Sequence, residues 1–170
     1  MRTFVGAVPW SVMAMTATII IAAVGSGVVA RWLGTRRPIA ALLLFGFGFV
    51  ISATLMPTAG ALEGGVSSGV CDLSRVGLPP LGQLTRISLT SLNVVLFVPL
   101  GVAVGLLPRN RHAGAAIVAA ISLTFVVESI QLLLPVLGRG CETADMFDNL
   151  LGLGLGAALG IVARPLVRRP

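Results

Sequence analysis

Five long apolar stretches constrain this chain more than any other feature of its sequence. They cover residues 8–30, 39–56, 89–107, 113–134 and 146–163. The first contains no charged residue, and the fourth contains only Glu128. An α-helix needs about 20 apolar residues to cross a bilayer, whereas the strands of a membrane barrel alternate in polarity. The pattern predicts an all-α bundle of five transmembrane helices, with residues 1–170 forming a single domain.

The composition excludes several classes of protein. Only 11% of the residues are charged, against about 25% in a soluble domain, so polar side chains are too few to cover a water-facing surface. The high hydrophobicity also excludes intrinsic disorder. The net charge of +6 does not indicate a nucleic-acid partner, because all twelve basic residues are arginines in short clusters between apolar stretches. No P-loop or Rossmann glycine motif occurs, so we expect no nucleotide partner.

The arginines predict how the helices are oriented, because cytoplasmic loops are enriched in basic residues. Five spans place eight arginines on one side and four on the other. The eight are Arg31, Arg36, Arg37, Arg109, Arg111, Arg164, Arg168 and Arg169, and the four are Arg2, Arg75, Arg86 and Arg139. We therefore expect the N-terminus and segments 57–88 and 135–145 outside, and the C-terminus in the cytoplasm. A cleaved signal peptide is the alternative for the first stretch, but its length and the three arginines after it favour a retained helix.

The two cysteines, Cys71 and Cys141, fall one in each of the two extracytoplasmic segments. Thiols on the oxidising side of a membrane often pair, so we expect a disulfide, with two free thiols as the alternative. Two cysteines and one histidine do not form a zinc ligand set, and we expect neither a metal nor a cofactor. Segment 57–88 is rich in glycine and proline, and its mildly apolar part, 76–84, either lies on the membrane surface or is a plain loop.

Several polar residues are expected at one common depth, in the outer third of the membrane. Glu128 lies about 10 Å below the outer end of its helix, because Pro135 ends that helix two turns later. A charge at the centre of a membrane helix costs about 2.5–3.5 kcal/mol or more, so Glu128 needs a partner such as Arg139 or Arg86, or it must be protonated. The residues expected to converge on one outward-facing ligand site are Asn93, Glu128, Gln131, Arg139, Asp145 and Asn149. We interpret Asp148 only as an acidic first-turn residue that stabilises the start of its helix.

Helical spacing supports this convergence. One face of the fifth helix is formed, in steps of three or four residues, by Asp145, Asn149, Gly152, Gly156 and Gly160. The three glycines form a small-xxx-small pattern, which predicts close packing against another helix. A second face with the same spacing runs along the third stretch through Arg86, Thr90, Asn93, Phe97 and Gly101.

Three motifs occur in order along the second half of the chain. N-x3-F-x-P-x-G begins at Asn93, E-x2-Q begins at Glu128, and R-x5-D-x3-N-x2-G-x3-G-x3-G begins at Arg139. In this order and spacing they resemble the VanZ-like family of small bacterial membrane proteins, with residues 89–163, the last three spans, as its core. The family is named after a protein associated with resistance to teicoplanin, a lipid-tailed glycopeptide that acts on cell-wall precursors. The resemblance implies a multi-pass protein of the bacterial plasma membrane, and the cysteine pair is not part of the matched pattern.

Three functions remain open at this point. The first is a non-enzymatic protein that binds or shields an amphiphile among the membrane lipids, either a lipid-linked cell-wall precursor or a lipid-tailed glycopeptide. The second is an intramembrane enzyme that uses Glu128 and Asp145 as acid and base on a lipid substrate. The third is a structural accessory protein whose polar cluster only holds helices together. Serine-protease and metalloprotease chemistry is excluded, because the chain has no lysine, no membrane-embedded histidine and no H-E-x-x-H motif.

The orientation can be tested with reporter fusions. Reporters placed at Gly34, Ala61, Asn110 and Gly138 should lie inside, outside, inside and outside, because eight arginines oppose four. Alkaline phosphatase and a cytoplasmic fluorescent protein, compared at each position, give the measurement. A reversed pattern would contradict both the orientation and an outward-facing site.

Overall fold

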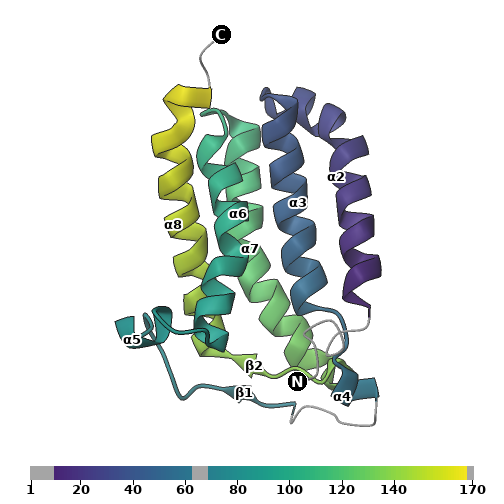
Figure 1. The fold of residues 1–170 in the computed structure, drawn as a ribbon, viewed down its shortest axis with the longest axis vertical. Coiled ribbons are helices and arrows are strands. Elements are labelled where there is room, and N and C mark those ends of the chain that lie inside the picture. Colours follow the sequence, from purple (N-terminus) through teal and green to yellow (C-terminus); the bar gives the residue numbers. More distant parts are fainter. Residues whose placement is uncertain (1–9, 63–68, 168–170) are drawn as a thin grey trace.

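Five long helices form the part of the protein that the structure describes (Figure 1). The computed structural model describes residues 10–62 and 69–167. The helices are α2 (Ser11–Leu33), α3 (Arg37–Thr54), α6 (Leu89–Leu106), α7 (Arg111–Leu133) and α8 (Thr143–Val167). Each is long and apolar enough to cross a membrane, so the predicted all-α, five-span bundle is confirmed, with ends within about one turn of those expected. Three residues counted for the orientation lie outside the described residues: Arg2, Arg168 and Arg169.

The helix ends follow from local sequence. Gly34 terminates α2 in a left-handed conformation (φ 63°), which a residue with a side chain rarely adopts. A capping box formed by Ser88 and Ser91 starts α6. The side chain of Asn110 accepts a hydrogen bond from the backbone N–H of Ala113 at 2.8 Å and so starts α7. These signals place short turns between α2 and α3 and between α6 and α7, so each pair is antiparallel.

The closest packing in the bundle joins α6 and α8. A Cβ atom added to Gly152, Gly156 or Gly160 would lie 2.0, 2.2 and 2.3 Å from backbone carbonyl oxygens of α6. Those oxygens belong to Val94, Val98 and Val102. The contact is reciprocal, since added Cβ atoms on Gly101 and Gly105 would meet carbonyl oxygens of α8 at 2.3 Å. The predicted glycine face is therefore the face on which the two backbones touch.

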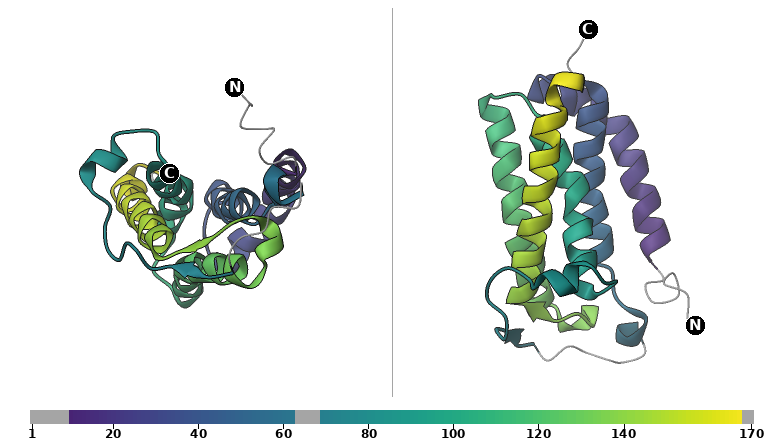
Figure 2. Two further views of the ribbon diagram at one scale, coloured as in Figure 1. Left: turned by 90° about the horizontal axis from the view of Figure 1, so that it is seen from below. Right: turned by 60° about the vertical axis from the view of Figure 1, so that its left-hand side comes forward.

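The remaining helices build outward from this pair. Helix α3 packs on α6, and α2 packs on α3 at the edge of the bundle (Figures 1 and 2). The apolar centre includes Phe97, Leu100 and Val50, each 0% exposed. On α2, by contrast, large apolar side chains such as Val24 are mostly exposed, as suits a helix that faces lipid.

Short elements gather at one end of the bundle. They are α4 (Ala59–Leu62), β1 (Cys71–Asp72), α5 (Leu81–Leu84), the 3₁₀ turn η1 (Pro135–Leu137) and β2 (Cys141–Glu142). Strands β1 and β2 pair in parallel, with Cys71 opposite Cys141, and the two cysteines form a disulfide with a Cα–Cα distance of 4.5 Å. The predicted disulfide is therefore confirmed. We call residues 69–80 the strap, because they run across this end of the bundle to α5 (Figure 2, left), and we call this end the strap end.

Two alanine substitutions on α8 should have opposite effects on stability. Gly156→Ala should lower the free energy of unfolding by about 1–3 kcal/mol, because its methyl group would collide with the carbonyl oxygen of Val98. Gly154→Ala is the control, because an added Cβ there meets nothing within 4 Å and alanine favours the helix. Thermal unfolding in detergent measures both. Equal changes would contradict close backbone packing.

Candidate functional site

Three of the predicted site residues lie near Asp145, in the first turn of α8 at the strap end. Its carboxylate interacts with the side chain of Asn93 on α6. It also lies within electrostatic range of the Arg139 guanidinium, in the connection before α8, and of the Glu128 carboxyl group on α7. Helix α6, helix α7 and the connection before α8 therefore each place a polar group near one carboxylate.

The polar face of α7 is turned into the protein. Glu128 is only 1% exposed, and its Oε2 accepts a hydrogen bond from the backbone N–H of Glu142 at 2.9 Å. Gln131 is 5% exposed, and its Nε2 donates to the carbonyl oxygen of Thr54 at 3.0 Å. That carbonyl belongs to the last turn of α3, where helical partners run out. Glu128 thus holds β2, and Gln131 holds the end of α3.

Arg139 supplies a positive charge near Asp145. It is half-buried, and its Nε donates to the carbonyl oxygen of Met56 at 3.3 Å. Burial lowers the pKa of Arg139 from its ordinary value, and the negative charge of Asp145 opposes that change. A guanidinium stays protonated at physiological pH regardless. The site therefore contains a cation that has lost part of its hydration.

Three buried acceptor oxygens near the strap end have no hydrogen-bond donor among the described residues. They are Gln131 Oε1, Asp148 Oδ1 and Asn149 Oδ1. Leaving such an oxygen unpaired costs about 1–3 kcal/mol. These atoms favour an environment that supplies N–H or O–H groups, from water or from a ligand.

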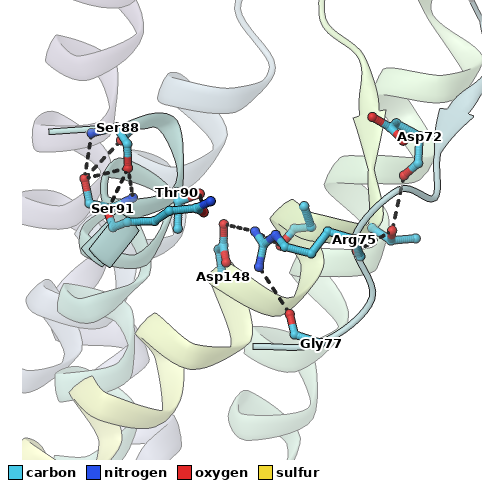
Figure 3. Close-up of polar contacts among 10 residues, drawn as sticks. Asp72, Arg75, Gly77, Ser88, Thr90, Ser91 and Asp148 are labelled. Atoms are coloured by element: carbon cyan, nitrogen blue, oxygen red, sulfur yellow. Dashed lines mark hydrogen bonds and ion pairs between the residues drawn. The ribbon is translucent and has the colours of Figure 1, made fainter. Parts of the chain in front are cut away.

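Asp148 corrects an expectation drawn from the sequence. It is not merely an acidic residue at the start of a helix, because it is 0% exposed and forms an ion pair with Arg75 of the strap (Figure 3). Arg75 Nη2 lies 2.6 Å from Asp148 Oδ2, and the same guanidinium donates to the carbonyl oxygens of Ala144 and Gly77. A buried carboxylate next to hydrocarbon needs such a cation, and the strap delivers it.

Further bonds fasten the strap to the start of α8. The hydroxyl group of Thr143 donates to the strap, lying 2.9 Å from the carbonyl oxygen of Arg75 and 3.2 Å from that of Asp72. The Oδ1 atom of Asp72 in turn accepts a bond from the backbone N–H of Ser74 at 2.7 Å. With the disulfide, these contacts hold residues 71–77 of the strap against the start of α8.

A groove of about 390 Å³ opens at the strap end between α2, α3 and α6. Its walls are mainly apolar and include Met15, Phe49 and Leu92. Two of the predicted site residues, Asn93 and Arg139, line it, whereas the other four do not. The α6 wall is exposed at the surface of the bundle, with Leu89 78% and Val95 63% exposed. The groove therefore combines an apolar side that faces lipid with a polar corner.

The structure separates the predicted residues into two layers. Asn93 and Arg139 reach the groove, while Glu128, Gln131, Asp145 and Asn149 lie behind them. Arg86, considered as a partner for Glu128, is exposed instead. Two functional residues were not predicted from the sequence: Arg75, the partner of Asp148, and Thr54, which lines the groove. Hydropathy does not single out either residue, because Arg75 lies in a loop and Thr54 is a common kind of polar residue at the end of a helix.

The fold and this site define a multi-pass membrane protein with a polar centre at one end of its helices. The VanZ/LLP1 family model matches residues 38–164, well over half of the chain. The chain therefore belongs to the VanZ/LLP1 family, as the motifs indicated. The match begins at the start of α3, ahead of the last three helices. Neither a curated protein nor a solved structure matches the chain significantly.

The buried ion pair can be tested through stability. Arg75→Ala should lower the free energy of unfolding by about 3–5 kcal/mol, because it leaves the fully buried Asp148 without a cation. Asp148→Asn in the Arg75→Ala background should recover part of the loss by removing the charge. Thermal unfolding in detergent, with the disulfide intact, gives the measurement.

Arg86→Ala serves as the matched control, since Arg86 lies in the same segment and is exposed. It should change stability by less than about 0.5 kcal/mol. If Arg75→Ala behaves like Arg86→Ala, the ion pair does not stabilise the strap.

Proposed function

We propose that this protein binds an amphiphile at the outer leaflet of the bacterial plasma membrane. The observation that carries the proposal is the groove at the strap end, with apolar walls and Arg139 and Asn93 at its polar corner. The ligand is either a lipid-linked cell-wall precursor or a lipid-tailed glycopeptide antibiotic such as teicoplanin. The arginine distribution supports an extracytoplasmic strap end.

An apolar tail fits the walls of the groove. Phe49 on α3 and Leu92 and Val95 on α6 provide contact surface, and the exposed α6 wall lets a chain enter sideways from the bilayer. Burial of apolar area adds little within a membrane, because lipid tails are equally apolar. Selectivity must therefore come from the polar end of the ligand.

The polar corner suits a head group with both an anion and hydrogen-bond donors. The guanidinium of Arg139 can form two parallel bonds with a phosphate or carboxylate, and partial dehydration strengthens them. Asn93, at the same corner, can accept hydrogen bonds from an amine or from sugar hydroxyls through its side-chain oxygen. Asp145, Glu128, Gln131 and Asn149 lie behind this corner and not in the groove itself.

Binding fits this arrangement better than catalysis. A general acid or base must come within hydrogen-bonding reach of the reacting atom, but neither Glu128 nor Asp145 lines the groove. One oxygen of Glu128 is already engaged by the backbone of Glu142. Both acids are therefore better suited to positioning Arg139 and Asn93 than to proton transfer.

Mass spectrometry of lipids that co-purify with the protein tests the proposal. Arg139→Gln should reduce retention of a polyprenyl-linked precursor about tenfold, because it removes a charge-assisted contact. Ala53→Phe should reduce it as well, by filling the groove that Ala53 lines. Arg86→Gln is the matched control, since it removes an exposed arginine from the same end.

Asp148 variants are not suitable controls, because this side chain is part of the buried ion pair. Teicoplanin tolerance of cells expressing each variant gives a second readout. A processed lipid that disappears with Glu128→Gln would favour the enzyme instead. No difference in lipid or tolerance among folded variants would favour a purely structural role.

A further inference from the structure

A second cavity lies at the opposite end of the bundle and belongs to none of the features described so far. It has a volume of about 480 Å³ and is bounded by the end of α6, the turn 108–110, the first turns of α7 and the last half of α8. The proposed amphiphile groove lies at the strap end, so the two are independent.

The cavity exists because the surrounding side chains are small. The glycine contacts hold α6 and α8 together along their length, and α7 faces them here with Ala113 and Gly114. A Cβ atom added to Gly114 would meet nothing within 4 Å. Space therefore remains among the three helices at the point where they leave the membrane.

The lining of the cavity combines apolar walls with arginine. Val104, Ile117 and Ile161 form walls, and the exposed Arg109 lies at the rim. Arg164 also lines it, donating to the carbonyl oxygen of Gly105 from Nε at 3.1 Å and Nη2 at 2.6 Å. That carbonyl lies in the last turn of α6, where helical donors run out. No lining residue is acidic.

The charge around the cavity is uniformly positive. The acidic residues that the structure describes all lie in segments at the strap end or next to it: Asp72, Glu128, Glu142, Asp145 and Asp148. The opposite end instead contains Arg31, Arg36, Arg37, Arg109, Arg111 and Arg164. A cavity that opens beside hydrocarbon, with an arginine at its rim and no carboxylate, is complementary to an anion that carries an apolar tail.

We infer that this cavity binds an anionic phospholipid of the leaflet on the arginine-rich side. The phosphate lies against Arg109, and one acyl chain lies between Ile117 of α7 and Ile161 of α8. Guanidinium and phosphate form charge-assisted, paired hydrogen bonds. The acyl chain fills space that the protein's own side chains leave open, so the lipid completes the packing among α6, α7 and α8.

Native mass spectrometry of the full chain in detergent tests the inference, with phosphatidylglycerol and phosphatidylcholine of identical acyl chains as probes. Phosphatidylglycerol should bind at one site at least tenfold more tightly than phosphatidylcholine. Arg109→Gln should weaken phosphatidylglycerol binding about tenfold. Arg111→Gln is its matched control, because Arg111 is exposed two residues away and does not line the cavity.

A second pair of variants tests the cavity itself. Gly114→Leu should abolish the tight phosphatidylglycerol adduct, because the new side chain occupies the cavity that Gly114 lines. Gly154→Leu is the control, since an added Cβ there also meets nothing within 4 Å but Gly154 lies outside the cavity lining. Both variants should keep the melting temperature of the wild type within a few degrees.

Each contrary result overturns the inference in a different way. Equal loss with Arg109→Gln and Arg111→Gln would indicate diffuse attraction to the arginine-rich end. Loss with Arg109→Gln but not Gly114→Leu would place the head group on the surface without the cavity. Inorganic phosphate that displaces phosphatidylglycerol at equal concentration would indicate a site for free anions. None of these results bears on the groove at the strap end.

Discussion

The contact between the backbones of α6 and α8 determines the arrangement of the rest of the molecule. Within a bilayer, helices gain little from burying apolar surface, so close van der Waals packing between backbones holds them together. Gly152 lies against Val94, and this contact fixes the register of the two helices next to Asn93 and about two turns from Asp145. The polar centre at the strap end is therefore a consequence of the glycine packing below it.

The strap adds a second constraint at the same end. A disulfide, a two-residue strand pair and the hydroxyl group of Thr143 hold it across the start of α8. In this position Arg75 neutralises Asp148, which is fully buried and could not otherwise remain charged at low cost. The loop is thus part of the structure that keeps the first turns of α8 polar inside a largely apolar protein.

Charge is distributed unequally between the two ends of the bundle, and the two cavities reflect this. At the strap end, Arg139 lies within electrostatic range of Asp145 and Arg75 pairs with Asp148, and the groove there suits a head group with mixed polarity. At the other end, arginines occur without acidic residues among the lining of the cavity. The protein therefore presents two chemically different surfaces to the two leaflets.

Much of this architecture is determined by the sequence alone, because its signals are local. Five apolar stretches predict five helices, and the spacing of Gly152, Gly156 and Gly160 predicts the contact face of α8, because helical period and residue size are properties of a single segment. The common depth of Glu128 and Asp145 follows from the same counting. Only the tertiary structure decided that Asp148 pairs with Arg75, that Gln131 bonds to the end of α3, and that Arg139 but not Glu128 reaches the groove. These outcomes depend on where a long connection crosses the ends of helices, and side-chain spacing within one helix contains no information about that path.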